Sequence, residues 1–275
     1  MKIVILGAGL DTRALTVKIR SAGTMKAFMS VTGEVSEEDA LAQARAWCGL
    51  DGQDYAAKVS VDTQFAWDPD DKLTSSWGVL EADLPPADLT VVSYDFGIKW
   101  NILRRLREQG IAVQVVPAKT SPADILAMKP DGVFMSNGPA DPAAVTYAVD
   151  AIKALMGKLP IMGICLGHQL MGLALGGKTY RLKFGHHGCN QPVKDMHTGC
   201  VHITSQNHNF AVDPETLPKD DVEVTHINLN DDTVEGLRHL KMPMFSVQFH
   251  PEAAPGPHDA SYLFERYRQM ILGNK

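Results

Sequence analysis

The segment PIMGICLGHQLMGLALGG, residues 160–177, decides the fold. Pro160–Ile164 form a short apolar run, typical of a buried strand, and residues 166–175 have the apolar spacing of a helix. Between them, Gly163-Ile164-Cys165-Leu166-Gly167 fits the pattern glycine-x-nucleophile-x-glycine, in which small neighbours permit a strained turn that exposes the middle side chain. The segment therefore predicts a strand, a nucleophile elbow and a helix in an α/β fold.

Strands and helices alternate through the preceding part of the chain. Strands are expected at 89–94, 111–116, 132–135 and 160–164, with helices at 97–109, 121–128 and 143–156. This alternation predicts a mostly parallel sheet with helices on both faces and ligands at the carboxyl ends of the strands. Residues 201–249 are richer in alternating β-branched side chains, so they are expected to add antiparallel strands.

Cys165 stands where the predicted helix begins, and the helix dipole there favours the thiolate form of a cysteine. The alternative is an inert core cysteine, because free cysteines are among the most buried residues. The glycines on both sides favour the nucleophile. The other cysteines, Cys48, Cys189 and Cys200, form no C-x-x-C pair, so a disulfide framework is not expected and a reducing cytoplasm is the natural setting.

Phe249-His250-Pro251-Glu252 follows an apolar strand predicted at 244–248. In extended chain, positions i and i+2 point to the same side, and Pro251 keeps this stretch extended. Glu252 can then hold one imidazole nitrogen of His250 and leave the other to serve a thiol. An isolated His-Pro-Glu is most often a surface turn, but together with the elbow it indicates a Cys-His-Glu triad.

The turn Ser136-Asn137-Gly138-Pro139 ends the neighbouring predicted strand. The backbone N–H of Gly138 and that of Leu166 could stabilise an oxyanion formed during attack by Cys165. The alternative is a tight strand-to-helix turn without a chemical role.

The N-terminus raises an alternative from another functional class. Residues 2–6 and the turn Gly7-Ala8-Gly9 resemble the start of a dinucleotide-binding βαβ unit, which would imply an NAD- or FAD-dependent oxidoreductase. Thr12 occupies the position where that motif needs a third small residue, and no βαβ unit follows. Helices are expected at 11–21 and 36–47, and residues 49–86 form a weakly patterned subdomain that continues into a linker.

Charge and hydropathy exclude other classes. The 26 basic and 32 acidic residues give a net charge of −6, which argues against a nucleic-acid-binding chain. No apolar run approaches the roughly 20 residues of a membrane span, and residues 1–16 are not expected to act as a secretory signal, because they lack its charged and long apolar regions.

Together these motifs resemble the class I (triad) glutamine amidotransferases, and within them the small, glutaminase subunits of carbamoyl-phosphate synthases. The similar segments run in order from residue 10 to the end: LDTRALT (10–16), YDFGIKWNILR (94–104), VVPAKTS (115–121), PDGVFMSNGPADP (130–142), GICLGHQL (163–170), KFGHHGCNQPV (183–193), SQNHNFAVD (205–213) and QFHPEAAPGPHD (248–259).

The resemblance implies a function and a site. Cys165 would attack the carboxamide of L-glutamine, His250 would protonate the leaving ammonia, and Glu252 would orient His250. The implied glutamine-binding residues are Gly138, Ala140, Leu166, Gln169, Asn207, Asn209 and Phe210. The ammonia would pass to a large subunit that makes carbamoyl phosphate for pyrimidine and arginine biosynthesis.

The resemblance also implies the fold and the cofactors. A flavodoxin-like amidotransferase domain with a central, mostly parallel sheet is expected at 87–275, after a shortened N-terminal domain plus linker at 1–86. ATP, Mg and bicarbonate would be used by the large subunit, and the glutaminase reaction itself would need no cofactor and no metal. A cytoplasmic heterodimer is expected, with neither nucleic acid nor membrane as a partner.

The chain departs from the family pattern in four places. Ala140, Asn209 and Cys189 each stand where the family commonly has glycine, and Ala140 is the one expected to crowd the substrate. The family's long region ahead of LDTRALT is replaced by MKIVILGAG. A misplaced start, a fragment and a natural short variant stay open, as does a non-catalytic scaffold that docks poorly.

Two further groups of residues have more ordinary interpretations. The histidines of the second half are expected to be structural, with His208 lining the pocket, because their spacing lacks a metal-site pattern; they are His186, His187, His197, His202 and His208. Arg104, Arg105 and Arg107 are expected on a solvated helix face, with an interface with a partner as the alternative.

Overall fold

The computed structural model describes residues 11–75, 83–254 and 256–274. The strand predicted at 2–6 and the glycine turn after it lie outside these residues, and so does the dinucleotide-binding alternative that rests on them. Within the described residues, none of the helices has the length and apolar character needed to cross a membrane.

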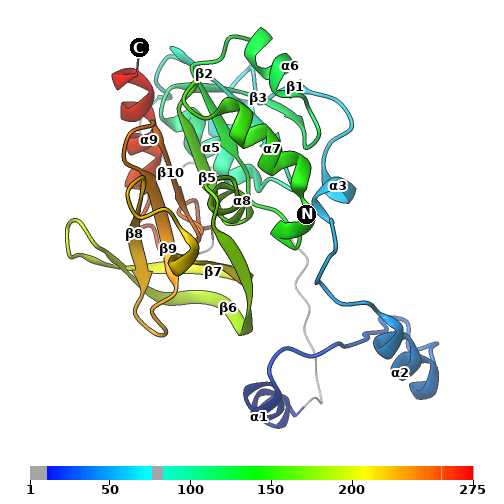
Figure 1. Cartoon of the computed structure of the whole chain (residues 1–275). Helices are drawn as coiled ribbons and strands as arrows, with labels where there is room; N and C mark the ends of the chain where they lie inside the picture. Colours follow the sequence, from blue (N-terminus) through cyan, green and yellow to red (C-terminus); the bar gives the residue numbers. More distant parts are fainter. Residues whose placement is uncertain (1–10, 76–82, 255, 275) are drawn as a thin grey trace.

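A single sheet organises the described residues, and its ten strands lie in the order β1-β3-β2-β4-β5-β10-β9-β8-β6-β7 (Figure 1). The strands are β1 (Phe65–Ala66), β2 (Leu89–Asp95), β3 (Ile111–Pro117), β4 (Gly132–Met135), β5 (Ile161–Ile164), β6 (Lys178–Asp195), β7 (Val201–Asp213), β8 (Val222–Asn228), β9 (Val234–His239) and β10 (Met244–Val247).

The middle of the sheet is parallel. Strands β3, β2, β4, β5 and β10 pair in parallel, whereas β1 and the strands from β9 to β7 pair antiparallel. The prediction of a parallel α/β core with added antiparallel strands is confirmed. The parallel strands β2, β4 and β5 end near residues 95, 135 and 164, so the turns that follow them meet at one edge of the sheet.

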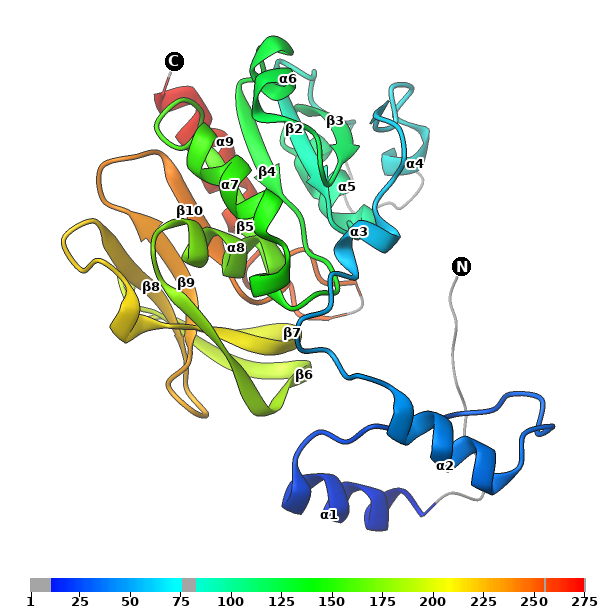
Figure 2. The same ribbon diagram turned by 45° about the vertical axis from the view of Figure 1, so that its right-hand side comes forward.

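Helices cover both faces of the parallel strands (Figures 1 and 2). On one face, α5 (Trp100–Glu108) and α9 (Tyr262–Gly273) bury apolar side chains such as Leu103 and Phe264. On the other, α6 (Pro122–Ala127), α7 (Thr146–Leu155) and α8 (Leu166–Ala174) pack around Ile152 and Leu170. Short 3-10 helices, η1 (Pro142–Ala144) and η2 (Pro214–Thr216), follow β4 and β7.

The expectation of a solvated arginine face on α5 is wrong. Arg104, Arg105 and Arg107 are all buried. Arg107 pairs with Asp71 through two hydrogen bonds of 2.6 and 2.7 Å, and Arg104 Nε donates to the carbonyl of Leu73 over 3.1 Å. The segment 67–75, with the short helix α4 (Lys72–Ser75), therefore contacts Arg104 and Arg107. Arg105 has other partners, Glu108 and His258. Helical periodicity within α5 carries no information about such partners.

The predicted N-terminal helices are present as α1 (Thr12–Ala22) and α2 (Glu37–Ala46). Asp11 and Ser36 cap them by accepting hydrogen bonds from Ala14 N and Asp39 N. Neither helix buries a residue, and both lie beside the sheet's β6–β7 end (Figure 2).

A boundary at residue 86 stays a prediction. The chain joins the sheet well before it, through α3 (Ala56–Val59) and through β1, which pairs with β3.

Candidate active site

Cys165 forms the strained turn that the glycine pattern predicts. It lies between β5 and α8 with φ 55° and ψ −104°, a conformation that costs a non-glycine residue free energy. Its neighbours have no room for side chains: a Cβ on Gly163 would lie 2.8 Å from the carbonyl carbon of Gly167, and one on Gly167 would lie 2.2 Å from the oxygen of Met135. Close packing of α8 against β4 and β5 therefore requires both glycines.

Gly167→Ala is expected to lower the free energy of unfolding by about 3 kcal/mol or more, since the new methyl group would overlap the backbone of β4. Urea denaturation followed by circular dichroism measures the loss. Gly273→Ala at the end of α9 is the control: an added Cβ meets nothing within 4 Å, so the change should be neutral or stabilising by up to about 1 kcal/mol. Equal stabilities of the two variants would contradict this account of the elbow.

His250 and Glu252 lie side by side, as their i, i+2 spacing predicts. His250 Nδ1 is 2.8 Å from Glu252 Oε1, and Glu252 is completely buried. Two residues of the loop and helix after β2 hold this pair: Lys99 Nζ lies 3.6 Å from Glu252 Oε1, and Asn101 Nδ2 donates to the carbonyls of Glu252 and Ala253. Cys165 and His250 line the same cavity.

The charges of this group stabilise one another. Burial alone would lower the pKa of His250, but the Glu252 carboxylate and the Cys165 sulfur outweigh it and raise that pKa well above its ordinary value. Burial alone would raise the pKa of Glu252, but His250 and, more weakly, Lys99 lower it. The arrangement therefore favours an imidazolium between a carboxylate and the sulfur.

A cavity of about 290 Å³ opens beside Cys165 and His250. This volume lies near the small end of ligand sites, so it suits a molecule the size of an amino acid. The lining includes six of the seven residues expected to bind glutamine: Gly138, Ala140, Gln169, Asn207, Asn209 and Phe210. The seventh, Leu166, is buried at the start of α8, next to Cys165. His208 lines the cavity as expected.

Several lining residues are fixed by neighbouring elements. Gln169 Nε2 donates to the carbonyl of Phe210 over 2.9 Å and to Gln248 Oε1 over 3.0 Å, which ties α8 to β7. A Cβ on Gly138 would lie 2.0 Å from the oxygen of Phe96, so only glycine fits that turn. Ala140 is partly buried and packs against the core that surrounds α8, while also lining the cavity.

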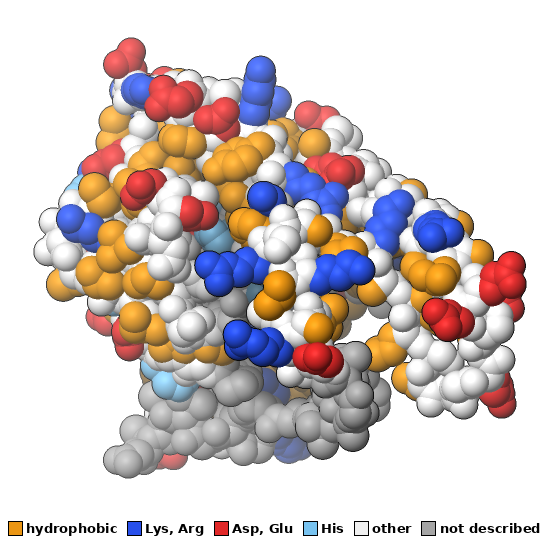
Figure 3. Space-filling model, turned by 90° about the horizontal axis from the view of Figure 1, so that it is seen from below, with side chains coloured by type: hydrophobic (Ala, Val, Ile, Leu, Met, Phe, Trp, Pro, Cys, Tyr) orange, Lys and Arg blue, Asp and Glu red, His pale blue; other side chains and the backbone are white. Residues whose placement is uncertain are grey.

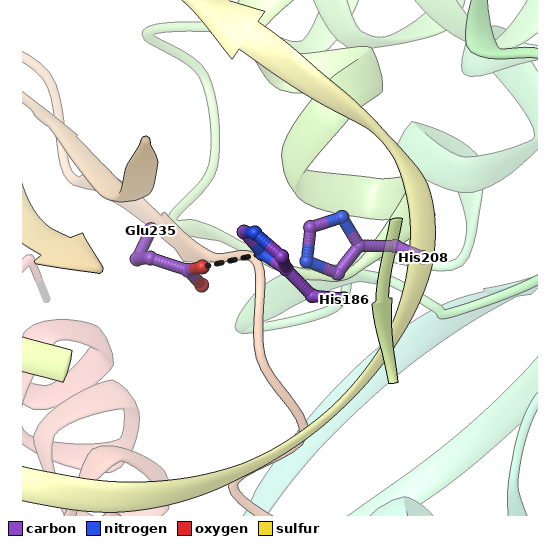
Figure 4. A group of neighbouring side chains, drawn as sticks. All are labelled: His186, His208 and Glu235. Carbon is purple, nitrogen blue, oxygen red and sulfur yellow. Dashed lines mark ion pairs between the residues drawn. The ribbon is translucent and has the colours of Figure 1, made fainter. Parts of the chain in front are cut away.

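A buried polar cluster adjoins the cavity through His208. Figure 4 shows its three members, His186, His208 and Glu235. Each of its three residues offers one atom that could bind a metal ion, and these atoms lie within 4.8 Å of one another. Hydrogen bonds already use these atoms: His186 Nδ1 and His208 Nε2 lie 3.0 and 2.8 Å from Gln206 Oε1, and Asn228 Nδ2 donates to Glu235 Oε1 over 3.1 Å.

The neighbouring carboxylates also favour the protonated form of His186, in which both ring nitrogens carry protons and cannot bind a metal ion. Burial opposes protonation, but Glu235 and Asp231 raise the pKa of His186 to about 9. A metal ligand would need the neutral ring. The absence of a functional metal stays a prediction.

Three other histidines are buried in the neutral form, and they predict acid sensitivity. Burial lowers the pKa of His168 and His208 to about 3 and that of His226 to about 4. The unfolded chain takes up these protons near pH 6.5, the ordinary histidine value, and the folded chain does not. The free energy of unfolding should therefore fall as the pH drops below 6.5, by roughly 1.4 kcal/mol per pH unit for each proton.

Burial also raises the pKa of Glu235, and this shift acts on the pH dependence in the opposite direction. Urea titrations at about pH 6.5 and about pH 5 measure the slope. His168→Asn removes one of the three histidines, so the free energy of unfolding should fall less steeply with decreasing pH, by about 1.4 kcal/mol per pH unit. A free energy of unfolding that is the same at both pH values would contradict the neutral, buried state of these rings.

Sequence reasoning missed three residues of the site. Lys99 and Asn101 support Glu252, and Leu50 lines the cavity from a segment predicted to belong to a weakly patterned subdomain. Leu50 does stand in the glycine-flanked stretch CGLDG, which is a turn signal, but such a signal does not say what the turn packs against.

Comparisons with known proteins agree with the geometry. Residues 92–270 match the family model described as glutamine amidotransferase class-I. The carbamoyl phosphate synthase small chain of Akkermansia muciniphila is 52% identical over 267 residues, which cover 97% of this chain and 69% of that protein. The chloroplastic small chain of Oryza sativa is 47% identical over 276 residues, covering 100% of this chain and 61% of that protein.

A solved structure adds a comparison of folds. A putative GMP synthase protein from Thermoplasma acidophilum superposes with a TM-score of 0.59 at 23% identity, over 68% of this chain and 95% of that one. At this identity the likeness concerns the fold alone.

Proposed function

The chain belongs to the carbamoyl phosphate synthase small chains, a family of class-I glutamine amidotransferases, and we propose that it hydrolyses L-glutamine to glutamate and ammonia. The observation that carries the proposal is that Cys165 and His250 line one amino-acid-sized cavity, with Glu252 Oε1 2.8 Å from His250 Nδ1.

Attack by the Cys165 sulfur begins the proposed reaction. The thiolate adds to the carboxamide carbon of glutamine, and the negative charge moves to the amide oxygen. The proposed donors to that oxyanion are the N–H group of Gly138, which lines the cavity together with Cys165, and the N–H group of Leu166, the residue that follows Cys165. Donors fixed before the reaction stabilise the transition state without reorganising.

His250 then acts as an acid and afterwards as a base. Its imidazolium donates a proton to the leaving nitrogen, the C–N bond breaks, and ammonia departs from a thioester on Cys165. The neutral imidazole next takes a proton from a water molecule that attacks the thioester, which releases glutamate and restores the thiolate. Glu252 orients the ring throughout and stabilises its charge.

The proposed use of the ammonia follows the named relatives. We infer that a large chain receives it and, with ATP, Mg and bicarbonate, makes carbamoyl phosphate for pyrimidine and arginine biosynthesis. The small chain would then need no cofactor of its own.

A glutaminase assay of this chain, alone and mixed with a carbamoyl phosphate synthase large chain, tests the proposal. Glutamate release is expected in both conditions, and ammonia transfer only in the mixture. A folded protein without glutaminase activity in either condition would contradict the proposal and leave a non-catalytic scaffold.

A further inference from the structure

A turn from the N-terminal part of the chain reaches the proposed glutamine cavity. Gln53 N donates to the carbonyl of Leu50 over 3.1 Å, and Gly52 has φ 71°. Glycine with positive φ at the third position is typical of a type II turn. Gly49, with φ 92°, sets the direction of the chain just before it. The turn 50–53 therefore has a conformation that its glycines specify.

Asp141 attaches this turn to the loop after β4. Its Oδ2 accepts a hydrogen bond from Gly52 N over 2.8 Å, and its own N–H donates to the carbonyl of Gln53 over 3.0 Å. Its Oδ1 accepts from Ala143 N and caps η1. One residue thus joins the turn to the loop that carries Gly138 and Ala140.

Two contacts further along the chain strengthen the attachment. Tyr147 Oη donates to Asp54 Oδ1 over 3.3 Å, and Arg181 Nη1 donates to Asp51 Oδ1 over 2.8 Å. The turn and Asp54, which follows it, are therefore connected to β6 and to α7.

Leu50 stands between two hollows. It lines the 290 Å³ cavity at Cys165, and it also lines a groove of about 640 Å³ between the α1–α2 segment and β6. Among the residues that the structure describes, Asn209 is the other one that lines both. The groove includes the basic side chains Lys26, Arg181 and Lys183, and blue side chains gather near the middle of the face in Figure 3.

We propose that Leu50 is a substrate-binding residue of the glutamine site, an apolar wall that Asp141 holds in place and that separates the cavity from the basic groove. The inference rests on the proposed function, because the ligand it concerns is glutamine. It assigns part of the site to a turn outside residues 92–270, the segment that matches the amidotransferase model.

The physical role of the wall is to keep the cavity small and partly apolar. The methylene groups of a bound glutamine contact a leucine side chain more favourably than they contact water. Leu50 would make this contact equally with bound glutamine and with the transition state. Its loss should therefore weaken glutamine binding and leave kcat unchanged.

Leu50→Ala tests the wall through the split between KM and kcat. The KM for glutamine is expected to rise about tenfold, with kcat within about threefold of the parent chain. Asp141→Ala, which releases the turn, should raise KM in the same direction. Leu41→Ala on α2 is the matched control, because it removes the same atoms from an exposed leucine outside both hollows, and KM should not change.

A second readout does not depend on glutamine hydrolysis. Iodoacetamide should alkylate Cys165 faster in Leu50→Ala than in the parent chain, since the missing wall opens the cavity toward the groove. A KM within twofold of the parent value together with an unchanged alkylation rate would overturn the inference. A parent chain that hydrolyses no glutamine would contradict the proposed function instead, and the alkylation rates would still decide the role of Leu50.

Discussion

Cys165→Ser is expected to reduce glutamine hydrolysis by at least about 10³-fold while the protein stays folded. The serine hydroxyl is far less acidic than a thiol, so the neighbouring imidazole would not hold it as an anion. Serine is close to cysteine in size, and the elbow backbone is set by Gly163 and Gly167, so the change should leave the turn intact.

Three measurements accompany this variant: glutamate release, the circular dichroism spectrum, and ammonia-dependent carbamoyl phosphate synthesis in the presence of a large chain. Only the first should change, because ammonia bypasses the thiol. Cys200→Ser, at an exposed cysteine, should leave all three unchanged. Glutamine hydrolysis that survives Cys165→Ser would show that the nucleophile is another group.

Glu252→Gln is expected to lower kcat by about 10²- to 10⁴-fold, as removal of the orienting carboxylate does in triad enzymes. The amide keeps the shape of the side chain but removes the charge that raises the pKa of His250. The imidazolium would then be less stable at neutral pH, and the ring would lose its fixed orientation. Glu265→Gln, at an exposed glutamate on α9, is the matched control and should retain full activity.

Glu252→Gln should also change how the free energy of unfolding depends on pH. The pKa of Glu252 is lowered, so its contribution is present above pH 4.5, the ordinary value, and is lost as the pH falls. The pKa of His250 is raised, so its contribution is complete below pH 6.5 and is lost as the pH rises toward the raised value.

The stability gap between the parent chain and Glu252→Gln should therefore be widest between pH 4.5 and 6.5. Urea denaturation across that range measures it. A gap that widens above pH 6.5 would contradict the pairing of His250 with Glu252.

Much of the fold follows from local patterns that the structure confirms. The strand, elbow and helix around Cys165 follow from apolar runs and two glycines, and Gly167 has the close contact that this pattern implies. The capped helices α1 and α2 follow from Asp11 and Ser36. These features depend on residues that are near one another in sequence, so a single sequence contains the information.

The features that sequence reasoning missed depend on distant segments. Arg107 is buried because Asp71 pairs with it, and no periodicity in α5 announces that partner. Leu50 lines the cavity from a turn in which Gly52 donates its N–H to Asp141, a residue 89 positions away. Glu235 and His186 lie on strands β9 and β6, and their pairing depends on the register of the sheet.

The most direct test of the account is to find the acyl group on the enzyme. The parent chain is mixed with glutamine, quenched in acid within its first turnovers, digested and analysed by mass spectrometry. The account predicts a glutamyl thioester on the peptide that contains Cys165, removable by hydroxylamine and absent from Cys165→Ser. Glutamine hydrolysis at the normal rate with no adduct at Cys165, or with the adduct on another residue, would contradict it.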